Sequence, residues 1–287
     1  MTLGIALISF NRGQYFKQTI KSLENQVKAG EVDYHLFQDG AVNKFSHALK
    51  SRPELISQSI RIFDRANLKR KIKHISEMNI GNALNQFRAI EFMSQYYDYF
   101  LIIEDDVVLS KYYLRLIRVM IEQFLSENDV FSVALNFKRM CEKSKIKENL
   151  DKAGYNLKFP GANSLHWWAE CFSSEKWQRA KPYFLDYIKL VENCDYQRRP
   201  AQKIKELFYR SGMFIAQTSQ DAGKDYAIKM AGMKRVNTIV NRGFYIGQIG
   251  LHFNPALYNK MEYASQKPFE FKSDLLLNSF NICDKNN

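Results

Sequence analysis

The chain has 287 residues, of which 46% are hydrophobic and 14% aromatic, and this composition excludes an intrinsically disordered protein. The formal charge of +12, from 42 Lys and Arg against 30 Asp and Glu, favours anionic partners: nucleotide phosphates, anionic lipid head groups, acidic glycans or nucleic acid. No apolar run approaches the roughly 20 residues that span a bilayer, and the four cysteines include no close pair at metal-ligand spacing. We therefore expect a cytoplasmic protein with reduced thiols that would meet the inner face of a membrane only from its surface.

Short apolar runs predict strands, and apolar residues three and four positions apart predict helices. In chain order the first segments are a strand Ile5–Phe10, a helix carrying Phe16, Ile20 and Leu23, a strand Tyr34–Phe37, a helix Asn43–Lys50, an edge segment Lys69–Ile75, a helix carrying Leu84, Phe87 and Ile90, and a strand Tyr99–Ile103. The first strand has no basic leader, so we do not expect a signal peptide. This alternation predicts a largely parallel sheet with helices on its faces.

The second half of the chain continues with less regular patterns. Its predicted segments are a helix Tyr112–Leu125, a strand Val130–Asn136, a flexible Lys-rich loop Lys138–Leu157, an apolar segment Leu165–Phe172, a basic helical stretch 173–215, a short helix ending at Gly232, a strand Arg235–Val240 and a glycine-rich tail with Gly243, Gly247 and Gly250. No Pro-, Gly- or Ser-rich linker requires a domain boundary.

Polar motifs follow three of the predicted strands: Asn11-Arg12, Gln38-Asp39 and Glu104-Asp105-Asp106. Ligands of open parallel sheets gather outside the carboxyl ends of the strands, so these motifs are expected to share one rim. Three consecutive carboxylates repel one another unless a cation lies among them, and a divalent metal that carries a phosphate ligand would meet that need. The alternative interpretation is a solvated acidic turn.

With these motifs the chain resembles the GT-A fold of nucleotide-sugar-dependent glycosyltransferases, and most of all the N-acetylglucosaminyltransferase I type. Asn11-Arg12 stands where that family has Asp-Arg, and Phe37-Gln38-Asp39-Gly40 is similar to its motif after the second strand. Glu104-Asp105-Asp106 matches the family's metal motif of the DXD kind, and Leu165–Phe172 is similar to its apolar segment with Ala-Glu. Asp221 lies eleven residues before Gly232, the spacing of the family's base Asp from a glycine.

The resemblance implies an α/β GT-A domain: a Rossmann-like nucleotide-binding sheet flanked by helices, with a smaller C-terminal acceptor-side region. Residues 1–137 would form the nucleotide-sugar-binding half and residues 138–287 the acceptor-side half of the same domain. The implied activity is metal-dependent transfer of a sugar, GlcNAc or another hexose, from a UDP-sugar to a hydroxyl of a glycan or lipid-linked glycan. Inversion of the anomeric centre is expected, and peripheral membrane association would suit the basic surface.

On the donor side the resemblance implies that Asp106 binds Mn²⁺ or Mg²⁺ together with the diphosphate. Glu104 and Asp105 would lie beside the water shell of the metal and the ribose or sugar hydroxyls. His252, in Gly250-Leu251-His252-Phe253, would be a second metal ligand, because many GT-A enzymes place a late-loop His on the metal.

The nucleotide would be held by other motifs of the same rim. Asp39 would accept a hydrogen bond from the uracil N–H, and Arg12 would support base, ribose or phosphate. Asn82 opens a helix whose N-terminal amides could face the nucleotide sugar. The alternatives are an ordinary Asp-Gly turn at Asp39 and a plain helix start at Asn82.

Asp221 is the predicted general base, which would remove the proton of the acceptor hydroxyl as that oxygen attacks the anomeric carbon. The alternative for Asp221 is a helix N-cap, and Asp225 and Asp186 are reserve candidates. Trp167 and Trp168 are neighbours on a predicted strand and would point to opposite faces, so at most one would form a stacking floor for a sugar.

Two other functions remain open from the sequence. A retaining GT-A glycosyltransferase would keep the fold and the donor site, but Asp221 would not act as base. A basic protein that binds nucleic acid or lipid would use the +12 charge, and its binding would fall steeply with salt and not respond to Mn²⁺. This second alternative leaves the acidic strand end unexplained, so no nucleic acid partner is expected.

Overall fold

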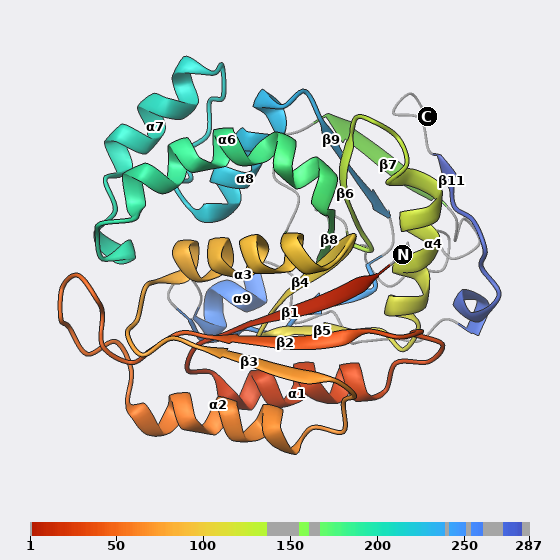
Figure 1. The fold of residues 1–287 in the computed structure, drawn as a ribbon, viewed down its shortest axis with the longest axis horizontal. Helices are drawn as coiled ribbons and strands as arrows, with labels where there is room; N and C mark the ends of the chain where they lie inside the picture. Colours follow the sequence, from red (N-terminus) through yellow and green to blue (C-terminus); the bar gives the residue numbers. More distant parts are fainter. Residues whose placement is uncertain are drawn as a thin grey trace.

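The computed structural model describes residues 2–136, 155–160, 167–238, 241–250, 254–260 and 272–282 (Figure 1). Nine strands of these residues form one sheet in the order β11-β7-β9-β6-β8-β4-β1-β2-β3, and helices cover both of its faces. The predicted α/β fold class is confirmed.

The N-terminal half forms the parallel part of the sheet. Its elements are β1 (Leu3–Ser9), α1 (Gly13–Glu24), β2 (Asp33–Gln38), α2 (Pro53–Arg65), β3 (Lys71–Ile75), α3 (Asn82–Tyr96) and β4 (Tyr99–Glu104). The strands β4, β1, β2 and β3 run parallel, with β1 buried at all seven positions. Parallel strands place their carboxyl ends at one edge, so the segments after β1, β2 and β4 lie along the same rim, as predicted.

The second half extends the sheet with mixed pairing. Its elements are β5 (Val107–Leu109), α4 (Tyr113–Phe124), β6 (Val130–Ala134), β7 (Tyr155–Pro160), β8 (Glu170–Ser173), α6 (Ser174–Val191), η1 (Tyr196–Arg198), α7 (Ala201–Arg210), α8 (Gln220–Met230), β9 (Lys234–Thr238), β10 (Gly243–Tyr245), α9 (Pro255–Lys260), η3 (Lys272–Leu275) and β11 (Asn281–Ile282). The strand β8 lies antiparallel between β4 and β6 and joins the two halves in one sheet. The assignment of residues 1–137 to nucleotide-sugar binding and of residues 138–287 to the acceptor side stays a prediction.

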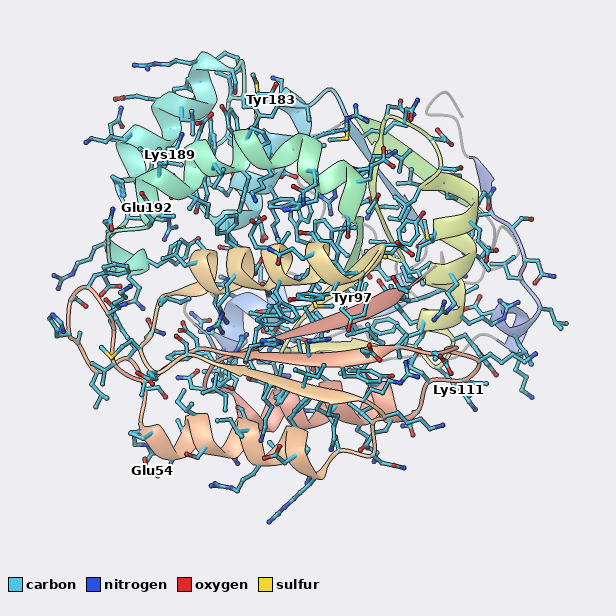
Figure 2. All side chains as sticks on the ribbon, in the orientation of Figure 1. Glu54, Tyr97, Lys111, Tyr183, Lys189 and Glu192 are labelled. Carbon is cyan, nitrogen blue, oxygen red and sulfur yellow. The ribbon has the colours of Figure 1, made fainter. Side chains whose placement is uncertain are left out.

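Two apolar cores pack against the two faces of the sheet. One contains Phe16 of α1, Phe63 of α2 and Ile117 of α4, and the other contains Ile90 of α3 and Phe184 of α6. Charged side chains such as Glu54 of α2 and Lys189 of α6 lie exposed at the periphery (Figure 2). None of the helices in the described ranges combines the length and the apolar composition that a bilayer crossing requires.

The predicted helix Asn43–Lys50 is wrong. This segment is a loop with isolated bridges from Val42 to Leu49 and from Asn43 to Asn79. The Asn43 carboxamide accepts hydrogen bonds from the amides of Phe45 and Ser46, at 3.0 and 2.9 Å, and so closes a turn that competes with a helix. The helix begins instead at Pro53, a residue suited to the first helical position.

The predicted loop Lys138–Leu157 lies outside the described residues up to position 154. Its end belongs to β7, so a strand begins before the loop was expected to finish. The edge segment at 69–75 and the basic helical stretch are confirmed as β3 and as α6 with α7. The predicted strand Arg235–Val240 is confirmed as β9 up to Thr238, and its last two residues lie outside the described ones.

Candidate functional site

The acidic motif forms the turn between β4 and β5, where Asp105 and Asp106 are almost fully buried. Hydrogen bonds from three separate segments fix this turn. Thr19 of α1 donates to the Asp105 carbonyl at 3.0 Å, the Phe10 amide donates to the Asp105 carboxylate at 3.3 Å, and the Ile246 amide donates to the Asp106 carbonyl at 2.9 Å. The turn is therefore built into the rim of the sheet, and the alternative of a solvated acidic turn is wrong.

Arg12, which follows β1, supplies the cation that the acids require. Its guanidinium pairs with the carboxylates of both Asp105 and Asp106. Burial opposes the charge of Arg12, but Asp105, Asp106 and Glu104 outweigh it and raise the pKa of the guanidinium. The sequence placed Arg12 at this rim, but it did not identify the acids as its partners.

Glu104, the first acid of the motif, turns toward α3 and α8. Its Oε1 accepts a hydrogen bond from Gln86 at 2.7 Å, and Gln86 in turn accepts one from Lys224 at 3.0 Å. Burial, followed by the charges of Asp221 and Asp106, raises the pKa of Glu104 to about 8. Burial also raises the pKa of Asp106 to about 6, although Arg12 favours its ionised form.

Asp39 follows β2 and binds the turn that leads into α3. Its two carboxylate oxygens accept hydrogen bonds from the amides of Gly40, Ile80 and Gly81 and from the Asn79 carboxamide, at 2.8 to 3.0 Å. A nucleobase N–H would have to share an oxygen with these donors. The contact of Asp39 with uracil stays a prediction.

Asn82 is exposed at the first position of α3. Gly81 precedes it with a φ of +83°, in the left-handed region that favours glycine, and α3 begins without a side-chain cap. The first amides of α3 are thus not engaged by a capping side chain and remain candidates for an anionic ligand.

Asp221 lies in the first turn of α8, where its carboxylate Oδ1 is 2.9 Å from the ammonium of Lys224. The helix is capped by Ser219, whose hydroxyl accepts from the Ala222 amide, so the N-cap interpretation of Asp221 is wrong. The side chain of Asp221 is 40% exposed and therefore accessible to a substrate.

The reserve candidates for the base lie elsewhere. Asp225 is buried beside Arg235, at 3.6 Å, and burial raises its pKa to about 7. Asp186 pairs with Lys189, at 3.3 Å, on the exposed side of α6. Of the three carboxylates, Asp221 is the one that the structure links to the acidic turn, through Lys224 and Gln86.

A glycine-rich segment from β10 to Gly250 crosses over the acidic turn. A Cβ atom on Gly247 would lie 2.3 Å from the Asp106 carboxylate and 2.6 Å from the Tyr245 hydroxyl, so only glycine allows this close approach. The Ile249 amide donates to the Tyr15 hydroxyl at 3.1 Å and ties the segment to α1. The spacing of the glycines was visible in the sequence, but their partner was not. His252 lies outside the described residues, and its role stays a prediction.

Trp167 and Trp168 lie just before β8, so their predicted position on a strand is wrong, but they belong to the two different cores and point to opposite sides as expected. The Trp168 ring stacks on Tyr245 with centroids 5.0 Å apart, and the Trp167 ring faces the cations of Arg235 and Lys224 at 3.8 and 4.4 Å. Both rings are buried, so core packing accounts for both of them.

Among the described residues, no group of three or more His, Cys, Asp or Glu side chains could hold a metal ion by itself. The site does contain one hard oxygen donor that suits a divalent cation, because Asp106 Oδ1 is buried and has no hydrogen-bond partner. Mg²⁺ is commonly bound through one or two carboxylates while substrate phosphates and water complete the shell. The residues present fit such a ligand set with Asp106 as its protein ligand.

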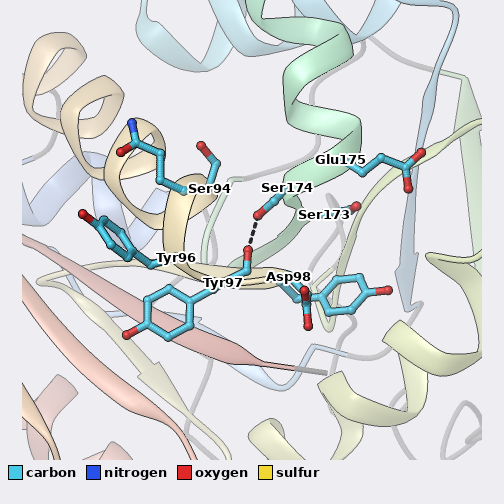
Figure 3. A pocket seen from close by; sticks show the side chains of 9 residues that line it. Ser94, Tyr96, Tyr97, Asp98, Ser173, Ser174 and Glu175 are labelled. Carbon is cyan, nitrogen blue, oxygen red and sulfur yellow. Dashed lines mark hydrogen bonds between the residues drawn. The ribbon is translucent and has the colours of Figure 1, made fainter.

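A separate pocket lies at the opposite end of β4 (Figure 3). It is lined by the end of α3, the beginning of β4 and the beginning of α6, including Tyr96, Asp98 and Glu175, and a hydrogen bond from Ser174 to the Tyr97 carbonyl crosses it. The strand β4 separates Tyr99 at this pocket from Glu104 at the acidic turn, so the pocket does not belong to the candidate site.

No protein-family model matches the sequence, and no curated protein matches it. Among solved structures the chain is similar to S. aureus TarS 1–349 in complex with UDP-GlcNAc, with a TM-score of 0.50 and 12% identity over 88% of this chain and 60% of that one. It is also similar to TarS 1–349 in complex with UDP, with a TM-score of 0.47 and 11% identity over 85% of this chain and 60% of that one. The chain thus spans less than two thirds of these TarS chains. The likeness shows the fold, and a GT-A-like α/β architecture is confirmed; the N-acetylglucosaminyltransferase I type stays a prediction.

Proposed function

We propose that the protein is a glycosyltransferase that moves a sugar from a UDP-sugar to an acceptor hydroxyl. One observation carries this proposal: two separate sets of contacts end on the same acidic turn after β4. Arg12 pairs with Asp106, and Asp221 is linked through Lys224 and Gln86 to Glu104. The fold likeness to TarS, whose crystal structure holds UDP-GlcNAc, supports a nucleotide sugar as donor.

The donor would lie over the acidic turn. Asp106 would hold Mn²⁺ or Mg²⁺ through its partnerless oxygen, and the ion when bound would offset the negative charge of the leaving diphosphate. Arg12 would hold the carboxylates of Asp105 and Asp106 in place through its two ion pairs, and the first amides of α3 at Asn82 would face a phosphate.

Asp221 would act as the general base of an inverting transfer. It is half-exposed and can reach an acceptor hydroxyl, whereas Asp225 is buried and its pKa is raised to about 7. In a retaining enzyme Asp221 would not take this proton, and the anomeric configuration of the product separates the two mechanisms.

The acceptor side would include the surface around α7. Phe214 is 84% exposed and Tyr209 47% exposed, their rings pack 5.7 Å apart, and Arg210 and Lys229 lie in the neighbouring helices α7 and α8. Exposed aromatic rings beside cations suit the head-group region of an anionic membrane, where a lipid-linked glycan would be presented. A purely nucleic-acid-binding function would leave the buried acidic turn without a role.

A thermal-shift panel of nucleotides and nucleotide sugars, with and without Mn²⁺, tests this function. We expect UDP and one or more UDP-sugars to stabilise the protein, by about 2.7 kcal/mol at a hundredfold excess over Kd. In Asp106→Asn, Mn²⁺ should no longer increase the stabilisation by the nucleotide. In Glu54→Gln, on the exposed side of α2, Mn²⁺ should increase it as in the wild type. The absence of stabilisation by every uridine nucleotide would overturn the proposal.

A further inference from the structure

Lys224 is a buried lysine on the inner side of α8, with a side chain only 3% exposed. Its ammonium has three partners from three parts of the chain. It donates to Gln86 Oε1 of α3 at 3.0 Å, lies 2.9 Å from Asp221 Oδ1, and lies 4.4 Å from the ring centroid of Trp167. The ammonium is therefore held by one hydrogen bond, one ion pair and one ring contact in the interior of the protein.

Gln86 continues the contacts of Lys224 to the acidic turn. Its Nε2 donates to Glu104 Oε1 at 2.7 Å, and its Oε1 accepts from Lys224. Because lysine can only donate and a carboxylate accepts, one orientation of the Gln86 amide satisfies both neighbours. Asp221, Lys224, Gln86 and Glu104 therefore form one directed chain of contacts across α8, α3 and β4.

The two oxygens of Asp221 differ in their surroundings. Oδ1 is buried against Lys224, although the side chain as a whole is 40% exposed. The exposure of the carboxylate therefore lies on the side of Oδ2, the oxygen that can accept a proton from an acceptor hydroxyl.

From these contacts we infer that Lys224 is a positioning residue for Asp221: it pairs with the carboxylate of the base and fixes it, through Gln86, relative to the acidic turn. The inference rests on the proposed function, in which Asp221 is the base. Lys224 would then be a further residue of the mechanism, one that contacts the base but neither the donor nor the acceptor.

Several ionisable side chains besides Lys224 surround Asp221. The groups that face Asp221 are Glu104 of β4, Asp225 of α8, Arg235 of β9, Tyr187 of α6 and Tyr196 of η1. Arg235 forms a two-bond pair with Glu170 and lies 3.6 Å from Asp225, and among the described residues Lys224 forms an ion pair with Asp221. Loss of Lys224 would remove an opposite charge that favours the charged form of the Asp221 carboxylate.

Lys224→Met, which keeps the length of the side chain and removes the charge, tests the inference. We expect kcat to fall by roughly ten- to a hundredfold with little change in KM for the donor. The acidic limb of the pH profile of kcat/KM should move upward by about one pH unit or more, because loss of a neighbouring cation raises the pKa of a carboxylate. Lys224→Arg should bring the acidic limb of the pH profile part of the way back to its wild-type position. Gln86→Leu should lower kcat but leave the acidic limb where it is in the wild type.

The matched control is Lys176→Met in the first turn of α6, whose side chain is likewise 3% exposed and whose ammonium lies 3.4 Å from Glu175, away from Asp221. A Lys224→Met enzyme with the pH profile of the wild type would overturn the inference. A carbon-13 NMR titration of the Asp221 carboxyl in wild type and Lys224→Met, without substrate, decides the same point independently. If the wild type transfers no sugar, the proposed function fails, while an unshifted titration in Lys224→Met refutes the role of Lys224.

Discussion

Two arginine–carboxylate clusters have the same chemistry but differ in burial and in whether every carboxylate oxygen accepts a hydrogen bond. In the core cluster, Arg235 is 3% exposed and donates two hydrogen bonds to the fully buried Glu170, which also accepts one from Ser132 at 2.6 Å. In the rim cluster, Arg12 is 28% exposed and pairs with Asp105 and Asp106.

The saturation of the acids separates the two clusters further. Both oxygens of Glu170 have hydrogen-bond donors, whereas Asp106 keeps one buried oxygen without a partner. A saturated buried pair fixes the packing of the strands around it, and an unsaturated acid retains capacity for a ligand. We therefore expect changes in the core cluster to affect folding, and changes around the rim cluster to affect ligand binding and transfer.

The largest expected effect concerns catalysis at the rim. Asp221→Asn removes the base that is accessible there, so transfer should fall by about 10²–10⁴-fold while donor binding is unchanged. Asp225→Asn, one helical turn along α8 and buried against Arg235, is the matched control and should lose far less activity. Steady-state assays measure the rate of sugar transfer, and calorimetric titration with UDP measures donor binding. An Asp221→Asn enzyme of normal activity would remove Asp221 from the mechanism.

The next largest effect concerns stability in the core cluster. Glu170→Gln removes the carboxylate that accepts two hydrogen bonds from the buried Arg235 and should destabilise the protein by about 3–5 kcal/mol. Asp106→Asn should change stability by only about 1 kcal/mol, because Arg12 keeps its pair with Asp105. Urea unfolding at neutral pH compares the two variants. Equal losses of stability would show that the two clusters do not differ as argued.

Much of the fold could be predicted from the sequence. The strands β1, β2 and β4 are short, unbroken apolar runs, and their parallel order follows from the alternation with helices. The helix α2 was missed because the Asn43 turn was taken for a helix start and the signal at Pro53 was not used. The rim motifs Arg12, Asp39 and the three acids were placed correctly at strand ends, since that position depends on strand order alone.

The partners within the site could not be predicted in the same way. Gln86 and Lys224 are 138 positions apart, and their hydrogen bond depends on how α8 packs beside α3. The approach of Gly247 to Asp106 likewise depends on the pairing of β10 with β5, which nothing in the local sequence encodes. Residue types reveal candidates for chemistry, but contacts between distant segments require the packed structure.

The pH dependence of stability tests Asp225, the acid beside Arg235 of the core cluster, at a somewhat smaller scale. Burial raises the pKa of Asp225 from 3.8 to about 7 in the folded protein. The unfolded chain therefore releases this proton first, and the stability that Asp225 contributes should fall as pH rises from about 4 to about 7, then level off. The contribution is about 4 kcal/mol at most, at roughly 1.4 kcal/mol per pKa unit. Asp225→Asn should flatten this part of the stability profile, whereas an unchanged profile would show that Asp225 is ionised throughout.

The smallest expected effect probes how closely the glycine-rich segment covers the rim cluster. A methyl group on Gly247 would meet the Asp106 carboxylate at 2.3 Å, whereas one on Gly250 would lie at an ordinary 3.5 Å from the Arg12 guanidinium. Gly247→Ala should push the segment away from the acidic turn, lower stability by about 1–3 kcal/mol and weaken UDP binding, while Gly250→Ala should leave both nearly unchanged. Thermal unfolding and UDP titration of this pair provide the measurement. If Gly247→Ala binds UDP as the wild type does, the segment does not shape the donor site, and the acidic turn and Arg12 alone would have to hold the diphosphate.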